Sequence, residues 1–477
     1  MVGVAQLVEH RVVAAVVESS NLSVHPKGYR IAAIALVSKT GERKLHVGSS
    51  PTAPAKRMRK RRKEMDNNFE YKEEYSWLTN ICLNVTDACN LACRYCFVEQ
   101  HPHYMTLDVA KQAVYFILDN LEKKKKFYNN PTLIASIAYF GGEPTILWNE
   151  IIVPLTDWIK KNNFPIELGM TTNGTLLNEE RIKYLYDNQI IPLLSIDGNK
   201  KTQEYNRPCL NNNVSSFDLV SKNIPIILKY FPNTTFRATI YSKTVRETFN
   251  NYLFAIDSGF KNVFFMPDHR HDWTQKEEQE LKTEVNKIFS FMDYSFTNNE
   301  VPINFSTINE SFERMLKRDI LVLKHNDFQL DLKRDISRCG LGTAMGAVGY
   351  DGSIYGCQEQ PSKDDKNIFL IGNIFTGIDK NKHNALIQKY AIQAITYCED
   401  KNLCDNCLLR TQCIGFNCPS SSYDLFNSFF ISARINCLWL QWIVQNAIVL
   451  NNKLVTENNK IFQQYLLNEC NFNKYFK

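Results

Sequence analysis

From Trp77 onward, short apolar runs of four to seven residues alternate with longer amphipathic segments. The apolar runs predict buried strands, and the amphipathic segments predict helices. The predicted strands are Ile81–Val85, Ile134–Phe140, Ile166–Thr171, Ile191–Ile196, Phe236–Ile240 and Val263–Met266. The predicted helices between them are Leu107–Lys125, Trp148–Lys161, Asn178–Asn188, Ser215–Tyr230 and Arg246–Ser258. Six β/α units in succession predict a parallel sheet that right-handed crossovers curl into an incomplete (β/α)6 barrel. Its site is expected where the strands end.

Composition separates the first 64 residues from the rest. They hold 13 Lys and Arg against four Glu and no Asp, whereas the remainder holds 43 basic and 46 acidic residues. The body is therefore nearly neutral, and nothing in its charge indicates nucleic-acid binding. Val4–His10 and Val47–Pro54 resemble translated transfer-RNA genes, and codons for Arg61-Arg62 can form a ribosome-binding sequence ahead of Met65. We expect residues 1–64 to be a mistranslated or disordered extension.

The chain has 477 residues and 14 cysteines. Most of the cysteines are clustered at short spacings, which favours metal binding in a reducing cytoplasm over a secreted disulfide framework. There is no run of about 18 apolar residues, so no membrane span is predicted.

Cys89, Cys93 and Cys96 directly follow the first predicted strand at C-x3-C-x2-C spacing. Three thiolates can hold three irons of a 4Fe–4S cube, and the fourth iron is then open to another ligand. A zinc knuckle or a redox thiol pair is the alternative. The stretch resembles the signature of radical S-adenosylmethionine (SAM) enzymes. The resemblance implies that the open iron binds the amino and carboxylate groups of SAM and that Tyr95 lies against the adenine.

Further motifs follow the next three predicted strands. Tyr139-Phe-Gly-Gly-Glu-Pro144 would be a turn if it stood alone, but here it resembles the family's clamp for the SAM amino group. Thr171–Leu177 and the Ser195-Ile-Asp-Gly198 stretch resemble the segments for the SAM ribose and carboxylate. Asp197 is either part of that site or a turn cap. By this resemblance the cofactor-binding residues are Tyr95, Gly141, Gly142, Glu143, Asn173, Ser195 and Arg207.

A second set of cysteines lies nearer the C-terminus and resembles the SPASM extension of radical SAM enzymes that act on peptides. That extension carries two auxiliary 4Fe–4S clusters, which would bring the cofactors to SAM and three clusters. By resemblance, the outer cluster is held by Cys404, Cys407, Cys413 and Cys437, and the inner one by Cys339, Cys357 and Cys418. One spacing departs from the pattern, because four residues instead of three separate Cys413 from Cys418. Two zinc ribbons are the alternative.

These motifs divide the body into domains: a barrel at 65–270, a charged helical connector at 271–338 with Gln275–Phe291 its clearest helix, a SPASM domain at 339–440 and a helical tail at 441–477. His269, Arg270 and His271 come at the end of the sixth strand, where they form either a polar loop or a substrate contact.

The resemblance implies a peptide maturase of the ranthipeptide type. A 5′-deoxyadenosyl radical would abstract hydrogen from a Cys-rich precursor peptide, and a Cys thioether would form. One alternative is an anaerobic sulfatase maturase, in which an Asp base follows the second SPASM cysteine. Here that residue is Gln358, whose amide cannot act as a base, and Glu359 is the nearest substitute. A non-catalytic iron–sulfur or zinc protein is the other alternative.

The expected partners are the precursor peptide, a flavodoxin or ferredoxin as reductant, and a separate protein that binds the leader peptide. The inner set has three cysteines, because Lys333 stands where sulfatase maturases have a fourth. Solvent, Cys398 or a substrate thiolate would fill the remaining iron, and we expect the substrate thiolate.

Overall fold

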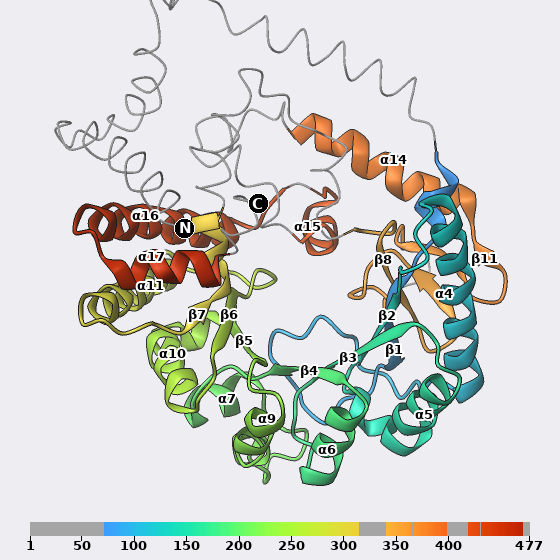
Figure 1. The fold of residues 1–477 in the computed structure, drawn as a ribbon, viewed down its shortest axis with the longest axis horizontal. Helices are drawn as coiled ribbons and strands as arrows, with labels where there is room; N and C mark the ends of the chain where they lie inside the picture. Colours follow the sequence, from blue (N-terminus) through green and yellow to red (C-terminus); the bar gives the residue numbers. More distant parts are fainter. Residues whose placement is uncertain (1–70, 314–339, 364–366, 398–417, 430, 471–477) are drawn as a thin grey trace, which may run out of the picture. The chain divides into compact units, whose positions relative to one another are not determined.

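The structure is a computed structural model that describes residues 71–313, 340–363, 367–397, 418–429 and 431–470 (Figure 1). The predicted extension at 1–64 lies outside these residues, as do Cys339, Cys398, Cys404, Cys407 and Cys413. The described residues form two compact units. The larger comprises 71–285 and the described parts of 340–440, and the smaller comprises 286–313 and 441–470. The predicted domain boundaries stay predictions.

Six strands of the larger unit lie side by side in chain order, and every neighbouring pair is parallel. This confirms the predicted parallel sheet, and each strand lies within one residue of its predicted position. The strands are β1 (Asn80–Thr86), β2 (Ala135–Gly141), β3 (Ile166–Thr172), β4 (Ile190–Ser195), β5 (Thr235–Ile240) and β6 (Asn262–Pro267).

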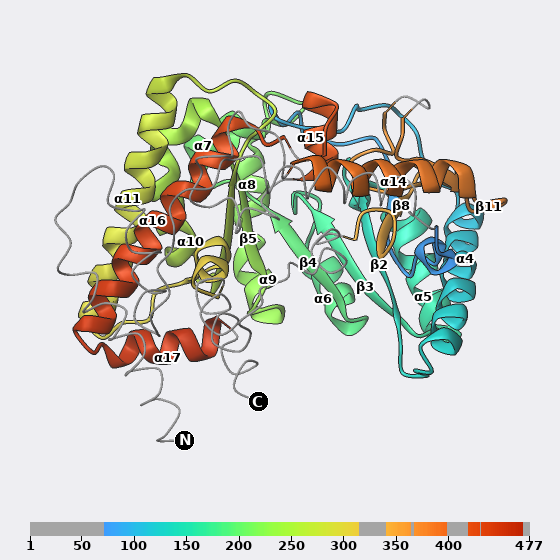
Figure 2. The same ribbon diagram turned by 90° about the horizontal axis from the view of Figure 1, so that it is seen from above.

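Helices connect the strands and lie along their outer side (Figures 1 and 2). They are α4 (Leu107–Phe127), α5 (Val153–Lys161), α6 (Glu179–Asp187), α7 (Lys200–Asn206), α8 (Ser216–Ser221), α9 (Ile224–Tyr230) and α10 (Thr248–Asp257). Ile81, Leu83 and Val85 alternate along β1 and are buried on one face, and α4 packs against β1 and β2. The other face of β1 carries Cys82 and Asn84.

Two predicted helices are divided in the structure. The predicted helix Trp148–Lys161 begins with a π-helical turn, η3 (Trp148–Ile152), and continues as α5, which has Pro154 in its first turn. The predicted helix Ser215–Tyr230 is broken into α8 and α9, and Pro225 lies in the first turn of α9. Proline fits the first turn of a helix but interrupts a helix interior, so each proline marks a new start. Short 3₁₀ turns also occur at η1 (Glu73–Ser76), η2 (Pro144–Leu147) and η4 (Ser242–Glu247).

The chain after residue 340 extends the same sheet beyond β1. Strand β8 (Met345–Val348) pairs in parallel with β1, so the edge of β1 that faces away from β2 is occupied. Three antiparallel strands follow: β9 (Ser353–Tyr355), β10 (Leu370–Asn373) and β11 (Gly377–Ile378). Helices α14 (Lys380–Tyr397) and α15 (Pro419–Phe426) complete this part. In α14, His383 is buried; its Nδ1 accepts from the Tyr71 hydroxyl (2.8 Å) and its Nε2 donates to the Gly342 carbonyl (2.6 Å).

The smaller unit is helical and has an aromatic core. It contains the later parts of α11 (Gln275–Thr297) and α16 (Arg434–Thr456), strand β7 (Asn304–Phe305), helical residues 306–313 and α17 (Lys460–Glu469). Phe296 packs edge-on against Phe462 and Tyr465, with ring centroids 5.1 and 5.2 Å apart. No helix in the described parts of either unit is long and apolar enough to span a membrane.

Candidate active site

The loop that carries Cys89, Cys93 and Cys96, called here the cysteine loop (residues 87–96), leaves the carboxyl end of β1. The chain after α7 holds it in place. Three backbone hydrogen bonds of 2.8–3.1 Å join the two segments: Ala92 N to Pro208 O, Arg94 N to Asn206 O, and Leu210 N to Asn90 O. Leu91 is fully buried and anchors the middle of the loop. The three thiols are thus presented from a backbone that is fixed on both sides.

Polar donors approach two of these thiols. The side-chain amide of Asn173 at the end of β3 lies 3.8 Å from Cys89 Sγ, and Arg207 Nη1 lies 4.0 Å from Cys93 Sγ. Burial raises the pKa of both Cys89 and Cys93 to about 12, while Cys96 is exposed. Thiols in this state bind a metal by releasing their protons. Hydrogen bonds to cluster sulfurs are one means by which a protein tunes an iron–sulfur centre.

The donor set fits a three-thiolate cluster site. The thiols share one short anchored loop and have hydrogen-bond donors beside them. Within the described residues, however, no three His, Cys, Asp or Glu side chains converge into a preformed metal site, so the cysteine side chains lie near one another without converging. Rotation of thiol side chains on a fixed loop would be enough to bring them together.

The two glycines of the Gly-Gly-Glu motif allow the end of β2 to approach the cysteine loop. A Cβ on Gly142 would lie 2.2 Å from the carbonyl oxygen of Ala88, and one on Gly141 would lie 2.2 Å from that of Thr86. The amides of Gly142 and Glu143 donate to these same two carbonyls, at 2.8 and 2.9 Å. Contact between two backbone segments therefore explains both glycines.

Glu143 is buried and joins this loop to β3. Its carboxylate accepts four hydrogen bonds, two from Thr145 (N, 3.1 Å; Oγ1, 2.5 Å), one from Thr172 Oγ1 (2.7 Å) and one from Asn173 N (2.7 Å). Burial raises the pKa of Glu143, and these hydrogen bonds oppose the increase. Three of these bonds fall on Oε1 and one on Oε2, so Oε2 keeps one of the carboxylate's acceptor positions. Binding of the SAM ammonium group by this side chain stays a prediction.

Asp197, directly beyond β4, binds Arg207. The carboxylate is 1% exposed and accepts from Arg207 Nε (3.0 Å), Asn206 Nδ2 (2.9 Å), Thr239 N (3.0 Å) and the Tyr95 hydroxyl. The Arg207 guanidinium lies 5.3 Å from the centre of the Tyr95 ring. Burial raises the pKa of Tyr95, so its hydroxyl stays protonated. Of the two roles considered for Asp197, the structure favours a role in the site.

The predicted SAM-binding residues therefore surround the cysteine loop. Tyr95 belongs to the loop itself, and Glu143, Asn173 and Arg207 come from three other segments and are joined to the loop through hydrogen bonds. Ser195, at the end of β4, is buried two residues before Asp197. Their individual roles toward SAM stay predictions.

A second pair of thiols lies beyond β9. Cys357 is buried, and its neighbours include Cys418 at the start of α15; burial raises its pKa, and the negative charges of Glu359 and Cys418 raise it further. The structure thus brings together the two members of the predicted inner set that it describes. Cys437, predicted for the outer set, lies in the first turns of α16.

The segment that follows Cys357 crosses the inner face of β1. Cys82 Sγ donates to Gln358 Oε1 (2.9 Å), and Asn84 Nδ2 donates to the Gln358 carbonyl (3.3 Å). These contacts could not be predicted from the sequence, because a lone cysteine in an apolar strand indicates only an inert core residue. Gln358 is therefore a neutral side chain that is held in place by the sheet.

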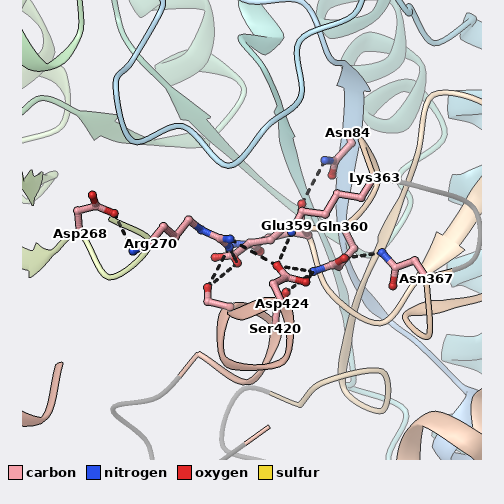
Figure 3. A network of polar contacts seen from close by, with 11 residues as sticks. Asn84, Asp268, Arg270, Glu359, Gln360, Lys363, Asn367, Ser420 and Asp424 are labelled. Carbon is pink, nitrogen blue, oxygen red and sulfur yellow. Dashed lines mark hydrogen bonds and ion pairs between the residues drawn. The ribbon is translucent and has the colours of Figure 1, made fainter. Parts of the chain in front are cut away.

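Arg270, after β6, links the end of the barrel strands to this segment (Figure 3). It donates to Glu359 Oε2 (2.7 Å), Ser421 Oγ (3.0 Å) and Asp424 Oδ2 (3.4 Å). Gln360, 1% exposed, donates to Ser420 Oγ (2.7 Å). We call Arg270, Glu359, Ser421 and Asp424 the arginine network.

His269, Arg270 and His271, which were expected to form a polar loop or a substrate contact, differ from one another in their hydrogen-bond partners. Arg270 belongs to the arginine network, and His271 Nδ1 pairs with Asp268 Oδ2 at 2.7 Å. Both ring nitrogens of His269 are shielded from solvent and make no hydrogen bond within the described chain. Residue type alone could not have separated His269 from His271.

Comparison with known proteins identifies the family. The sequence profile of the radical SAM superfamily matches residues 83–256, which extend from β1 to α10 and include the cysteine loop, Glu143, Asp197 and Arg207. The cysteine-type anaerobic sulfatase-maturating enzyme of Clostridium perfringens is 28% identical over 290 residues, which cover 57% of this chain and 72% of that enzyme. This chain is a radical SAM enzyme. SAM and a 4Fe–4S cluster are its cofactors.

Solved structures of radical SAM enzymes share the fold. A structure of anSMEcpe with bound AdoMet superimposes with a TM-score of 0.60 at 21% identity and covers 79% of this chain and 95% of that one. A second, which holds AdoMet and the Cp18Cys peptide, gives 0.59 at 21% identity and covers 79% and 99%. At this identity the likeness concerns the fold, and it supports the α/β architecture with a parallel sheet.

Proposed function

We propose that this radical SAM enzyme modifies a cysteine-containing peptide, and that the modification is a thioether bond between the cysteine sulfur and a carbon of another residue. When bound, the cluster supplies the electron that cleaves SAM, and the resulting 5′-deoxyadenosyl radical abstracts hydrogen from the peptide. The single observation that carries the proposal is the proximity of Cys357 and Cys418, which lie on two segments that the arginine network joins to the end of β6.

The chain's own residues would position the reactants. The cysteine loop would hold the SAM cluster, and Asn173 and Arg207 would donate to its sulfurs. Tyr95 and Arg207, both fixed by Asp197, would offer a stacking surface and a positive charge to SAM. Cys357 and Cys418, with Cys339, would hold an auxiliary cluster to which a substrate thiolate could bind.

A peptide substrate is supported by the relatives. A solved relative holds the Cp18Cys peptide together with AdoMet, and several relatives found in sequence are sulfatase-maturating enzymes. Formylglycine formation is therefore a second candidate function. Gln358 weighs against it, because its side-chain amide accepts from Cys82, its backbone carbonyl accepts from Asn84, and an amide cannot accept a proton near neutral pH.

Mass spectrometry of the product separates the two candidates. The full chain, reconstituted anaerobically with iron, sulfide, SAM and dithionite, is incubated with Cys-rich peptides encoded beside its gene and, in parallel, with Cp18Cys. The expected result is that a Cys-rich peptide encoded beside the gene loses two hydrogens. Replacement of the Cp18Cys thiol by an aldehyde oxygen would favour the second candidate. If no peptide is altered or accelerates 5′-deoxyadenosine formation, peptide modification is refuted.

A further inference from the structure

His269 is a buried polar group that lacks a partner. It lies two residues beyond the end of β6, and neither ring nitrogen makes a hydrogen bond within the described part of the chain. Leaving a buried donor or acceptor unsatisfied is unfavourable, because the group has lost its hydrogen bonds to water. Its neighbours Arg270 and His271 both have carboxylate partners. The difference indicates that His269 finds its partner in a molecule that binds there.

Charged groups surround the imidazole from two segments. Asp268 and Arg270 flank it on its own loop, and Glu359 faces it from the segment after Cys357. Burial lowers the pKa of His269; Glu359 and Asp268 oppose the decrease, Arg270 adds to it, and the Pro267 carbonyl lies nearby without reaching hydrogen-bond geometry. Because the net shift is downward, the ring is neutral near pH 7 and keeps one nitrogen lone pair available for a proton.

The proposed reaction requires a proton acceptor. Thioether formation breaks one C–H bond and one S–H bond of the peptide and makes one C–S bond. The hydrogen atom goes to the 5′-deoxyadenosyl radical, one electron goes to an oxidant of the iron–sulfur class, and the thiol proton goes to a base. Formylglycine formation begins with the same loss of a hydrogen atom, an electron and a proton. A base is therefore needed for either product.

The other polar groups of this region already have partners. Gln358 is an amide held by Cys82, and the Glu359 carboxylate accepts from Arg270 (2.7 Å) and Ser421 (2.9 Å). Asp268 accepts from His271 and from the Arg270 amide, and Asp424 accepts from Arg270, Gln360 and Lys363. Within the described residues, His269 is the titratable side chain of this group whose polar atoms are all buried and make no hydrogen bond, whereas Glu359 is paired with Arg270 through its Oε2.

We propose that His269 is the catalytic base that receives the thiol proton of the peptide substrate. This inference rests on the proposed peptide modification and adds a named residue to it. The carbon–hydrogen bond is broken by the SAM-derived radical, so His269 acts only in the later loss of the proton.

The order of these steps gives the test. His269→Asn and His269→Gln are compared with His271→Asn, a matched control from the same loop. The substrate is a peptide that the unaltered enzyme modifies, deuterated at the carbon that reacts. We expect both His269 variants to transfer deuterium to 5′-deoxyadenosine at a rate within about threefold of the parent, while product formation falls about 10²–10⁴-fold, the usual contribution of a general base. The control is expected to do both at the parent rate.

Three outcomes overturn the proposal. Product formation at the parent rate in both His269 variants would exclude the base, and an equal loss of deuterium transfer and product would assign His269 to binding instead. Iron content and the urea midpoint show whether each variant is folded. If neither variant folds, the parent's pH profile decides: product formation is expected to fall as pH drops below about 6.5, and a flat profile refutes the base. If no peptide is modified by the parent, the proposed function itself fails.

Discussion

Replacing Asp197 by Asn tests whether the buried ion pair with Arg207 holds the site together. The Arg207 and Asp197 side chains are 8% and 0% exposed. Asn keeps the shape of Asp197 but loses the charge, and it can accept on one atom where the carboxylate accepts four hydrogen bonds on two. Arg207 is then left as a buried cation without its counter-ion. Removing one partner of a buried pair costs about 3–5 kcal/mol.

Urea unfolding of the metal-free chain measures the effect. With a slope of about 3 kcal/mol per M, we expect the midpoint of Asp197→Asn to fall by about 1 M or more. The matched control is Asp218→Asn, which breaks the exposed pair with Lys200 and is expected to leave the midpoint unchanged. A double variant that adds Arg207→Met removes the stranded cation, so it is expected to regain part of the loss. The reasoning fails if Asp197→Asn matches its control, or if the double variant is less stable than the single one.

Three further predictions concern other parts of the larger unit. Gly142→Ala forces a Cβ against the Ala88 carbonyl, so it is expected to destabilise the folded chain by about 1–3 kcal/mol and to lower the amount of bound iron. The control Gly169→Ala is expected to be tolerated, because its Cβ would meet nothing closer than 3.7 Å. Equal iron content in the two variants would contradict this prediction. Burial lowers the pKa of His383, so the neutral ring stabilises the fold fully above about pH 6.5, and this stabilisation is lost as pH falls below that value. His383→Asn is therefore expected to weaken the pH dependence of the urea midpoint between about pH 7.5 and 5.5. An unchanged pH dependence in the variant would count against this prediction. Changing all three cysteines of the cysteine loop to Ala is expected to abolish 5′-deoxyadenosine formation while auxiliary iron remains, and continued SAM cleavage would disprove the assignment.

The strands could be predicted because each contains a short apolar run, and at least alternate residues along each strand are buried. The break between α8 and α9 was not predicted, although Pro225 stands where a continuous helix would lose a hydrogen bond. Strand β8 could not be predicted in this way. Its four residues, Met-Gly-Ala-Val, have little strand preference of their own, and it is a strand because β1 offers a free edge.

Sequence motifs indicated which residues gather around the cysteine loop but not their contacts. The spacing of Glu143 does not reveal that four protein donors already occupy its carboxylate. The arginine network joins residues that are 89 and 151 positions apart, and only the fold brings them together. His269 was part of a recognised trio, yet its lack of a partner depends on what the fold places around it.

The pairing of β8 with β1 has a consequence for how the two cysteine-bearing segments can diverge. Four consecutive residue pairs join the two strands, from Asn80 with Met345 to Leu83 with Val348. They fix β8, which leads to Cys357, against β1, which leads to the cysteine loop. Insertions or deletions in the chain between β6 and β8 would change the length of that connection without moving β8, because β8 is held by its pairing with β1. A slip of one residue in this pairing, by contrast, would turn every side chain of β8 to the opposite face. We therefore expect homologues to vary freely in the length of that connection and to keep the spacing between β8 and Cys357 constant.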